Sequence, residues 1–158
     1  FKQKVCDGIE SGITIDNNII YFGDTSGKLH AFDVDKRTML WTFSTHANIR
    51  TIPVFNDEAV FIGNLAGRIY SVNKTTGKLI WKLDTKGLIN TTPLLTKNFL
   101  IQPDYNKKVL IINTITGDNI KSMEFDRRVK LTPVYYDEIL YLGSDRGQIH
   151  AYKTTKLE

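Results

Sequence analysis

The sequence contains one cysteine, Cys6, three histidines and no long apolar run. A single cysteine excludes an internal disulfide framework, and a membrane-spanning helix would need roughly 20 consecutive apolar residues. The 21 basic and 17 acidic residues are too nearly balanced for a disordered tail. We therefore expect one globular domain of 158 residues that does not insert directly into a membrane.

Motifs that carry catalysis are also missing. The chain has no Gly-x-Ser-x-Gly elbow, no phosphate-binding glycine loop, and no His-Glu-x-x-His or Cys-x-x-Cys pattern. His30 and His150 lie 120 residues apart, and Tyr70 and Leu110 stand between them at steps of 40 residues. Because the four positions are equivalent but only two are histidine, they indicate a packing position rather than a set of metal ligands. We predict no catalytic residue, no metal-binding residue and no cofactor.

A period of forty residues runs through the chain without insertions. It is carried by prolines, glycines and tryptophans at fixed phases: Pro53, Pro93 and Pro133; Gly27, Gly67 and Gly147; Gly77 and Gly117; Trp41 and Trp81. A repeat of this length is typical of β-propellers and solenoids, in which each repeat is one supersecondary unit.

Each repeat contains four short apolar segments separated by polar or glycine-containing turns, and no window has a helical period. The second segment is apolar on both faces, as in 59–62, which indicates a strand covered on both sides. We predict an all-β fold, a β-propeller of four-stranded antiparallel blades. The expected blades are about 12–43, 52–83, 92–123 and 132–152, with residues 1–5 as a closing strand.

The segment from the third to the fourth strand resembles the tryptophan-docking motif of PQQ-like (quinoprotein-type) β-propellers, Ala-x-Asp-x-x-Thr-Gly-Lys-x-x-Trp. The second repeat matches it at Ser71, Asn73, Thr76, Gly77, Lys78 and Trp81. The first repeat has Lys36-Arg37-Thr38 in place of Thr-Gly-Lys, and the third has Lys121 in place of tryptophan.

The motif predicts how blades dock on one another. The tryptophans should pack between blades, the glycines should take positive φ, and the Asp or Asn should hydrogen-bond the turn backbone. Because Arg37 stands at a glycine position, we expect the first of these turns to be locally different. The expected docking residues are Trp41, Trp81, Gly77, Gly117, Asp33, Asn73 and Asn113.

The resemblance implies a ring that is usually larger than four blades, commonly eight. Three arrangements follow: a closed four-bladed ring, two chains that form one eight-bladed ring, or a segment of a longer propeller. An open half-ring would expose two apolar blade faces, so we expect closure or pairing. We favour a segment of a larger propeller, completed by self-association or by additional blades.

Charge is distributed unevenly between the two faces of such a propeller. The loops after the second and fourth strands hold ten basic and six acidic residues, whereas the turns after the first strands hold one basic and five acidic residues. We predict a protein-binding face and no nucleic-acid binding, because no basic stripe alternates with exposed aromatics. The candidate partner face contains His46, Arg50, Lys86, Arg127, Arg128, Lys130 and Arg146.

We therefore expect a non-catalytic scaffold for a protein partner. The resemblance implies an assembly or adaptor role and a periplasmic or extracytoplasmic location, similar to the propeller lipoprotein of the outer-membrane β-barrel assembly machinery. One alternative is a ligand-sensing propeller attached to a kinase or another enzyme. Another is a fragment of a quinone-dependent dehydrogenase, although the chain has no adjacent cysteines, which the resemblance associates with many such enzymes, and no full-size propeller to enclose the cofactor.

Overall fold

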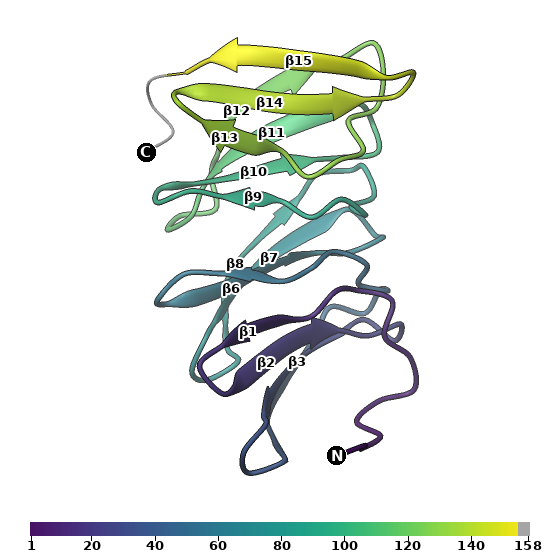
Figure 1. Cartoon of the computed structure of the whole chain (residues 1–158), viewed down its shortest axis with the longest axis vertical. Coiled ribbons are helices and arrows are strands. Elements are labelled where there is room, and N and C mark those ends of the chain that lie inside the picture. The colour runs from purple at the N-terminus through teal and green to yellow at the C-terminus, as the bar shows by residue number, and fades with distance from the viewer. Residues whose placement is uncertain (155–158) are drawn as a thin grey trace.

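A computed structural model describes residues 1–154 of the chain, and within them it contains fifteen strands in four antiparallel sheets and no helix. Figure 1 shows the sheets stacked one after another, from the N-terminal sheet at the bottom to the C-terminal sheet at the top. This part of the chain has no helix long and apolar enough to span a membrane.

Each sheet is one blade, and its strands follow one another in chain order. The first blade contains β1 (Thr14–Asp16), β2 (Ile19–Gly23), β3 (Lys28–Asp33) and β4 (Thr38–Ser44). The second contains β5 (Val54–Phe55), β6 (Ala59–Gly63), β7 (Arg68–Asn73) and β8 (Leu79–Asp84). The third contains β9 (Leu94–Leu95), β10 (Phe99–Pro103), β11 (Lys108–Asn113) and β12 (Asn119–Glu124). The fourth has three strands in the described residues, β13 (Val134–Tyr136), β14 (Ile139–Ser144) and β15 (Gln148–Lys153).

The same register recurs in every complete blade. Ala31 pairs with Trp41 and Ser71 with Trp81, and a bulge follows each pair before the strand resumes. The third blade has the same bulge after Ile111. A bulge increases local twist and re-aims the side chains beyond it. The forty-residue period is therefore a period of backbone geometry as well as of sequence.

The core lies between adjacent blades. One cluster joins the first and second blades through Tyr21, Leu29, Val60 and Ile62, which are all at most 1% exposed. Two further clusters join the second blade to the third and the third to the fourth. Strand β6 is buried along its whole length because neighbouring blades cover both of its faces, as the apolar run 59–62 predicted.

The four blades form an open arc, because the first and the fourth lie at opposite ends of the molecule (Figure 1). Residues 1–5 form no strand. The closing strand expected at residues 1–5 therefore stays a prediction. These residues lie against the first blade, where Gln3 Nε2 donates to Arg37 O at 3.4 Å.

Candidate functional site

The loops after the second and fourth strands of the blades lie on one face, which we call the loop face: residues 24–28, 44–50, 64–68, 84–90, 104–108, 124–130 and 144–148. Backbone hydrogen bonds join each fourth-strand loop to the next blade. Leu65 N donates to Asn48 O at 3.0 Å, and Tyr105 N donates to Leu88 O at 3.0 Å. The loop face is thus held rigidly by the blades beneath it.

All seven residues expected on the partner face lie on the loop face. Five of them are exposed and two, Arg127 and Arg128, are half-buried. The exposed ones are His46, Arg50, Lys86, Lys130 and Arg146. They do not form one cluster: Arg50 pairs with Glu10 at 2.8 Å on the first two blades, whereas Arg128 and Lys130 belong to the loop between the third and fourth.

The acidic residues of the loop face are either paired or buried. Asp84 faces Arg68 at 3.6 Å, Glu124 faces Lys108 at 3.0 Å, and Asp126 faces Arg127 at 4.0 Å. Asp145 is paired twice, and Asp24 and Asp104 are each 3% exposed.

Four exposed cations of the loop face, by contrast, form no ion pair within residues 1–154: Lys28, Lys86, Lys107 and Arg146. The last three of these stand at turns with positive φ, between 63° and 68°. Lys107 was not among the residues predicted for this face, although it lies in the glycine phase of Gly27 and Gly67. The exposed charge that remains unpaired on this face is therefore positive.

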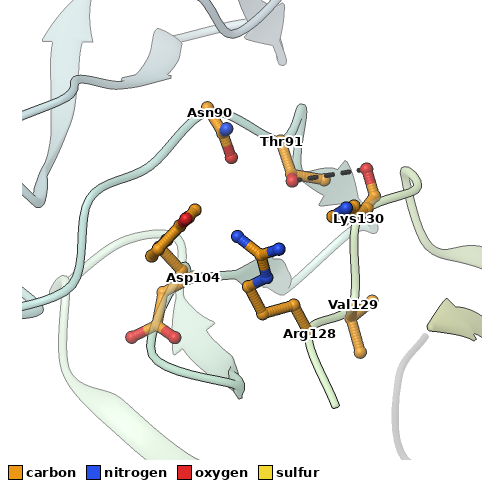
Figure 2. Close-up of a pocket in the computed structure, with 7 residues that line it drawn as sticks. Asn90, Thr91, Asp104, Arg128, Val129 and Lys130 are labelled. Atoms are coloured by element: carbon orange, nitrogen blue, oxygen red, sulfur yellow. Dashed lines mark hydrogen bonds between the residues drawn. The ribbon is translucent and has the colours of Figure 1, made fainter. Parts of the chain in front are cut away.

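A pocket of about 310 Å³ opens on the loop face between the third and fourth blades. Figure 2 shows the Arg128 side chain reaching into the space between the loop of Asn90 and Thr91 and the loop of Asp104. The wall also contains Tyr105, Val129 and Lys130. Thr91 Oγ1 donates to Lys130 O at 3.5 Å, the dashed line in Figure 2, and so holds the two loops together.

Two contacts fix the Arg128 guanidinium at the pocket. It lies over the Tyr105 ring, 4.4 Å from the centroid, and its Nε is 3.2 Å from Asp145 Oδ2. Lys130 Nζ binds the other oxygen of Asp145 at 2.7 Å. The hydrogen bond from Lys130, followed by that from Arg128, holds the pKa of Asp145 below its usual range. One carboxylate thus anchors two cations, which leaves a net positive charge in this cluster.

Asp104 is an unusual wall residue. Its Oδ1 accepts from Lys108 N at 2.9 Å, but its Oδ2 is buried without a hydrogen-bond partner. Burial raises the pKa of this carboxyl. In the first blade the equivalent Asp24 binds His30 six residues further on, at 2.9 Å, whereas the third blade has Leu110 there. The sequence contains the signal for this unpaired oxygen, because the residue six positions after Asp104 is a leucine and cannot form the hydrogen bond that His30 forms with Asp24.

His30 and His150, which stand at equivalent positions in the first and fourth blades, have structural contacts. His30 is 5% exposed, stacks on Phe22 with ring centroids 5.0 Å apart, and bonds Asp24. His150 Nε2 lies 2.9 Å from Ser144 Oγ, the equivalent pair in the fourth blade. Within residues 1–154 no group of three or more His, Cys, Asp or Glu is arranged to hold a metal ion.

The expected docking residues lie between blades. Trp41 Nε1 donates to Lys74 O at 2.9 Å, and Trp81 Nε1 donates to Thr114 O at 2.8 Å. A Cβ atom added to Gly77 would lie 2.8 Å from the Trp41 ring, and one added to Gly117 would lie 2.7 Å from the Trp81 ring. Asp33, Asn73 and Asn113 each accept backbone N–H groups of the following turn.

The first of these turns differs locally from its counterparts, because β4 begins at Thr38, one position earlier in the period than β8 at Leu79 and β12 at Asn119. Its backbone φ is nevertheless similar. Arg37 adopts φ 57°, close to the φ 70° of Gly77, so the first turn keeps the left-handed backbone of its counterparts. The strain of a side chain at this φ is of order 1–2 kcal/mol, and the packed blade supplies enough favourable contacts to hold it.

The comparisons with known proteins agree with this architecture. A family model described as outer membrane protein assembly factor BamB matches residues 2–128. BamB from Moraxella catarrhalis is similar in structure, with TM-score 0.82, 20% identity, and coverage of 95% of this chain and 51% of that chain. The chain thus spans about half the length of that BamB chain. No curated protein matches the sequence.

Two other solved structures have similar folds. The computationally designed Ika4 protein has TM-score 0.80 and 18% identity, with 98% of this chain and 99% of that chain covered. A quinohemoprotein alcohol dehydrogenase from Comamonas testosteroni has TM-score 0.74 and 15% identity, with 89% and 29% covered. At these identities the structures establish the fold alone, whereas the family match covers most of the sequence. The chain belongs to the PQQ-like β-propeller family of the outer membrane protein assembly factor BamB.

Proposed function

We propose that the chain is a non-catalytic propeller scaffold whose loop face binds an acidic segment of a partner protein during outer-membrane protein assembly. One observation carries this proposal: the acidic groups of the loop face are paired or buried, while Lys28, Lys86, Lys107 and Arg146 remain exposed without ion pairs. A surface with one sign of free charge attracts a partner of opposite sign and accelerates the encounter.

The pocket beside Arg128 is where this binding would be most specific. A partner carboxylate entering it would meet a guanidinium already held by the Tyr105 ring and by Asp145, so little side-chain entropy would be lost on binding. The family relationship supports an assembly factor in the periplasm or another extracytoplasmic compartment. Fractionation of source cells tests the location, and detection confined to the cytoplasm would contradict it.

Binding is tested with a fluorescent deca-glutamate peptide as the probe. The triple variant Lys86→Glu, Lys107→Glu and Arg146→Glu should weaken binding at least tenfold, because like charges repel. The control reverses three lysines at the opposite ends of the strands, Lys36, Lys78 and Lys97, and so changes the net charge equally. It should weaken binding no more than twofold at about 0.15 M salt, where the Debye length is about 8 Å. Equal losses in both variants would refute a specific loop face.

The pocket also supports a second candidate, a propeller that senses a small anionic solute. Its volume of about 310 Å³ is at the lower end of the range for small-molecule sites, roughly 300–1,000 Å³. Succinate is a suitable probe. Saturable binding that Arg128→Ala abolishes, with deca-glutamate binding unchanged, would favour sensing over the scaffold role.

The proposal does not extend to a quinone-dependent dehydrogenase, because the likeness to that enzyme, at 15% identity, supports the fold alone. We propose no redox step for this chain.

A further inference from the structure

Large aliphatic side chains are exposed at one repeated position in the last strand of each complete blade. These strands contain a bulge, and the residue at the bulge has no counterpart in the register of the neighbouring strand. That residue is Leu40 in β4, Ile80 in β8 and Ile120 in β12, and the three are 43%, 46% and 59% exposed. Because a bulge re-aims a side chain, the same backbone feature turns an aliphatic residue toward solvent in three successive blades.

The three bulge residues belong to a concentration of exposed apolar side chains. Between residues 16 and 130, eight large hydrophobic side chains are exposed, and five of them lie in the last strands of the blades. Single exposed hydrophobic residues are ordinary on a protein surface, whereas a group of them on one face marks an interaction site. We call the five residues the outer row: Met39, Leu40, Leu79, Ile80 and Ile120.

The place of the outer row in the arc shows that its exposure is not an effect of the chain ends. The first strands of the blades meet on the inside of the arc, where Thr14, Val54 and Leu94 line one groove, so the last strands lie on the outside. The second blade has a complete blade on each side, and its Leu79 and Ile80 are still 50% and 46% exposed. The row is therefore an outer surface of the stacked blades themselves.

Positive charge accompanies the outer row. The segments 38–42, 78–82 and 118–122, which contain it, hold three lysines and one acidic residue. The three lysines are exposed and form no ion pair within the described residues 1–154. A partner segment that complements this surface would therefore carry aliphatic side chains with acidic residues beside them. The lysines are Lys78, Lys82 and Lys121.

The direction of the outer row selects the conformation of such a segment. The blades are stacked one after another, so the row crosses their strands instead of following one strand (Figure 1). A segment along the row cannot continue the ladder of any single strand, and the bulges also interrupt the outer strand edges. Its backbone groups must then pair within the segment, as they do in a helix. Packed sheets lie about 10 Å apart, so a helix of about 18 residues, about 27 Å long, spans three blades.

We propose that the outer row is a second docking surface, which binds an amphipathic acidic helix of a partner protein. The aliphatic face of the helix would cover Leu40, Ile80 and Ile120, and acidic residues at the edge of that face would meet Lys82 and Lys121. This mode of recognition lays an apolar helix face on an apolar surface. It differs from binding at the loop face, which rests on free charge and the Arg128 pocket.

Binding of a labelled peptide tests the proposal. The probe is a helix-forming peptide of about 18 residues with leucines on one face and glutamates beside them. We expect saturable binding by fluorescence anisotropy and a gain of helical circular dichroism, which must come from the peptide because residues 1–154 contain no helix. A scrambled peptide of the same composition should bind at least tenfold more weakly. No saturable binding, equal binding of the scrambled peptide, or a gain of strand signal would overturn the proposal.

Substitutions in the outer row locate the site. Leu40→Ser, Ile80→Ser and Ile120→Ser together should weaken peptide binding at least tenfold, because they remove the aliphatic contacts while changing only exposed positions. The control makes three Ile→Ser changes in or just before the first strands, and it should alter binding no more than twofold. Equal losses in both variants would show unspecific apolar binding and would overturn the proposal. The control residues are the exposed Ile13, Ile15 and Ile52.

Charge reversal gives an independent test that leaves the apolar row intact. Lys82→Glu with Lys121→Glu should weaken binding of the glutamate peptide at least fivefold and strengthen binding of a matched peptide that has lysines in place of the glutamates. An unchanged preference between the two peptides would overturn the role of these lysines. The loop-face variant with Lys86→Glu, Lys107→Glu and Arg146→Glu should bind the glutamate peptide within twofold of the unmodified protein. A larger loss there would place the peptide on the loop face and would overturn a second surface.

Discussion

Replacing Asp104 by asparagine should stabilise the protein, although it removes a native charge. The same position is occupied by Asp24 in the first blade and Asn64 in the second. In all three blades one side-chain oxygen accepts the backbone N–H four residues later, at 2.8–3.1 Å. Asparagine keeps that oxygen, so the substitution should leave the loop after the second strand intact.

The blades differ in what the second side-chain atom meets. Asp24 Oδ2 binds the buried His30, and Asn64 Nδ2 donates to Thr45 O at 3.4 Å. Asp104 Oδ2 is buried without a hydrogen-bond partner. In Asp104→Asn the amide would face Thr85 O, which is one period after Thr45 O. An unsatisfied buried polar group costs about 1–3 kcal/mol, so we expect the free energy of unfolding at pH 7 to rise by about 1–2 kcal/mol.

The gain should depend on pH in a defined direction. Burial raises the pKa of Asp104 above that of the unfolded chain, so the folded state holds this proton more tightly. Stability is therefore lost as pH rises from the unfolded pKa, about 3.9, through the raised folded pKa. The variant lacks this group. Its advantage should be small near pH 4, increase as Asp104 ionises, and be complete above the folded pKa.

Urea unfolding of both proteins between pH 4 and pH 7, at one protein concentration, measures the difference. The control is Asp24→Asn, which should destabilise by about 1–3 kcal/mol because it breaks a buried hydrogen bond to His30. Equal or lower stability of Asp104→Asn at pH 7 would refute the reasoning. So would a gain of the same size at every pH, because the raised pKa would then have no part in it.

Three further substitutions test the blade interfaces, with unfolding in urea as the measurement. Trp81→Ala should cost about 3–5 kcal/mol, and a loss below about 1 kcal/mol would contradict the burial of its ring. Gly117→Ala should cost about 1–3 kcal/mol more than Gly147→Ala, because only the former places a Cβ atom against the Trp81 ring. Both glycines have positive φ, so equal losses of stability would refute the clash. Lys121→Trp should stabilise the protein by roughly 1–2 kcal/mol, because the ring would fill a cavity of about 330 Å³. The control Lys82→Trp, at an exposed residue, should change stability by less than about 0.5 kcal/mol. Equal effects of the two substitutions would exclude the cavity as the cause.

The blades could be predicted from the sequence because their causes are local. A two-sided apolar run such as 59–62 needs cover on both faces, and glycine at a fixed phase marks a turn with positive φ. The glycine rule did not predict the positive φ of Arg37, where blade packing outweighs the local backbone preference of a residue with a side chain. The closing strand at residues 1–5 stays a prediction, because a strand requires a neighbouring strand and these residues have none in the described arc.

The pocket and the ion pairs of the loop face could not be predicted, because they depend on side chains from different loops. Arg128, Tyr105 and Asp145 meet only after two loops have been brought together by the blades beneath them. The charge count predicted which face carries the excess of cations. It did not show which cations lack an acidic partner, since that depends on distances that a count does not contain.

The interface between the third and fourth blades explains why a pocket and an unusual carboxylate occur in the same region. At the first two blade interfaces, Trp41 and Trp81 pack against glycines. At the third interface Lys121 occupies the position equivalent to these tryptophans, and an apolar cavity lies beside it. Unfilled volume weakens an interface because the lining atoms lose contacts. The loop face above this interface contains the Arg128 pocket, formed by loops of both blades. The interface with this cavity thus lies beneath the part of the loop face where loops from neighbouring blades form a hollow that a partner side chain can enter.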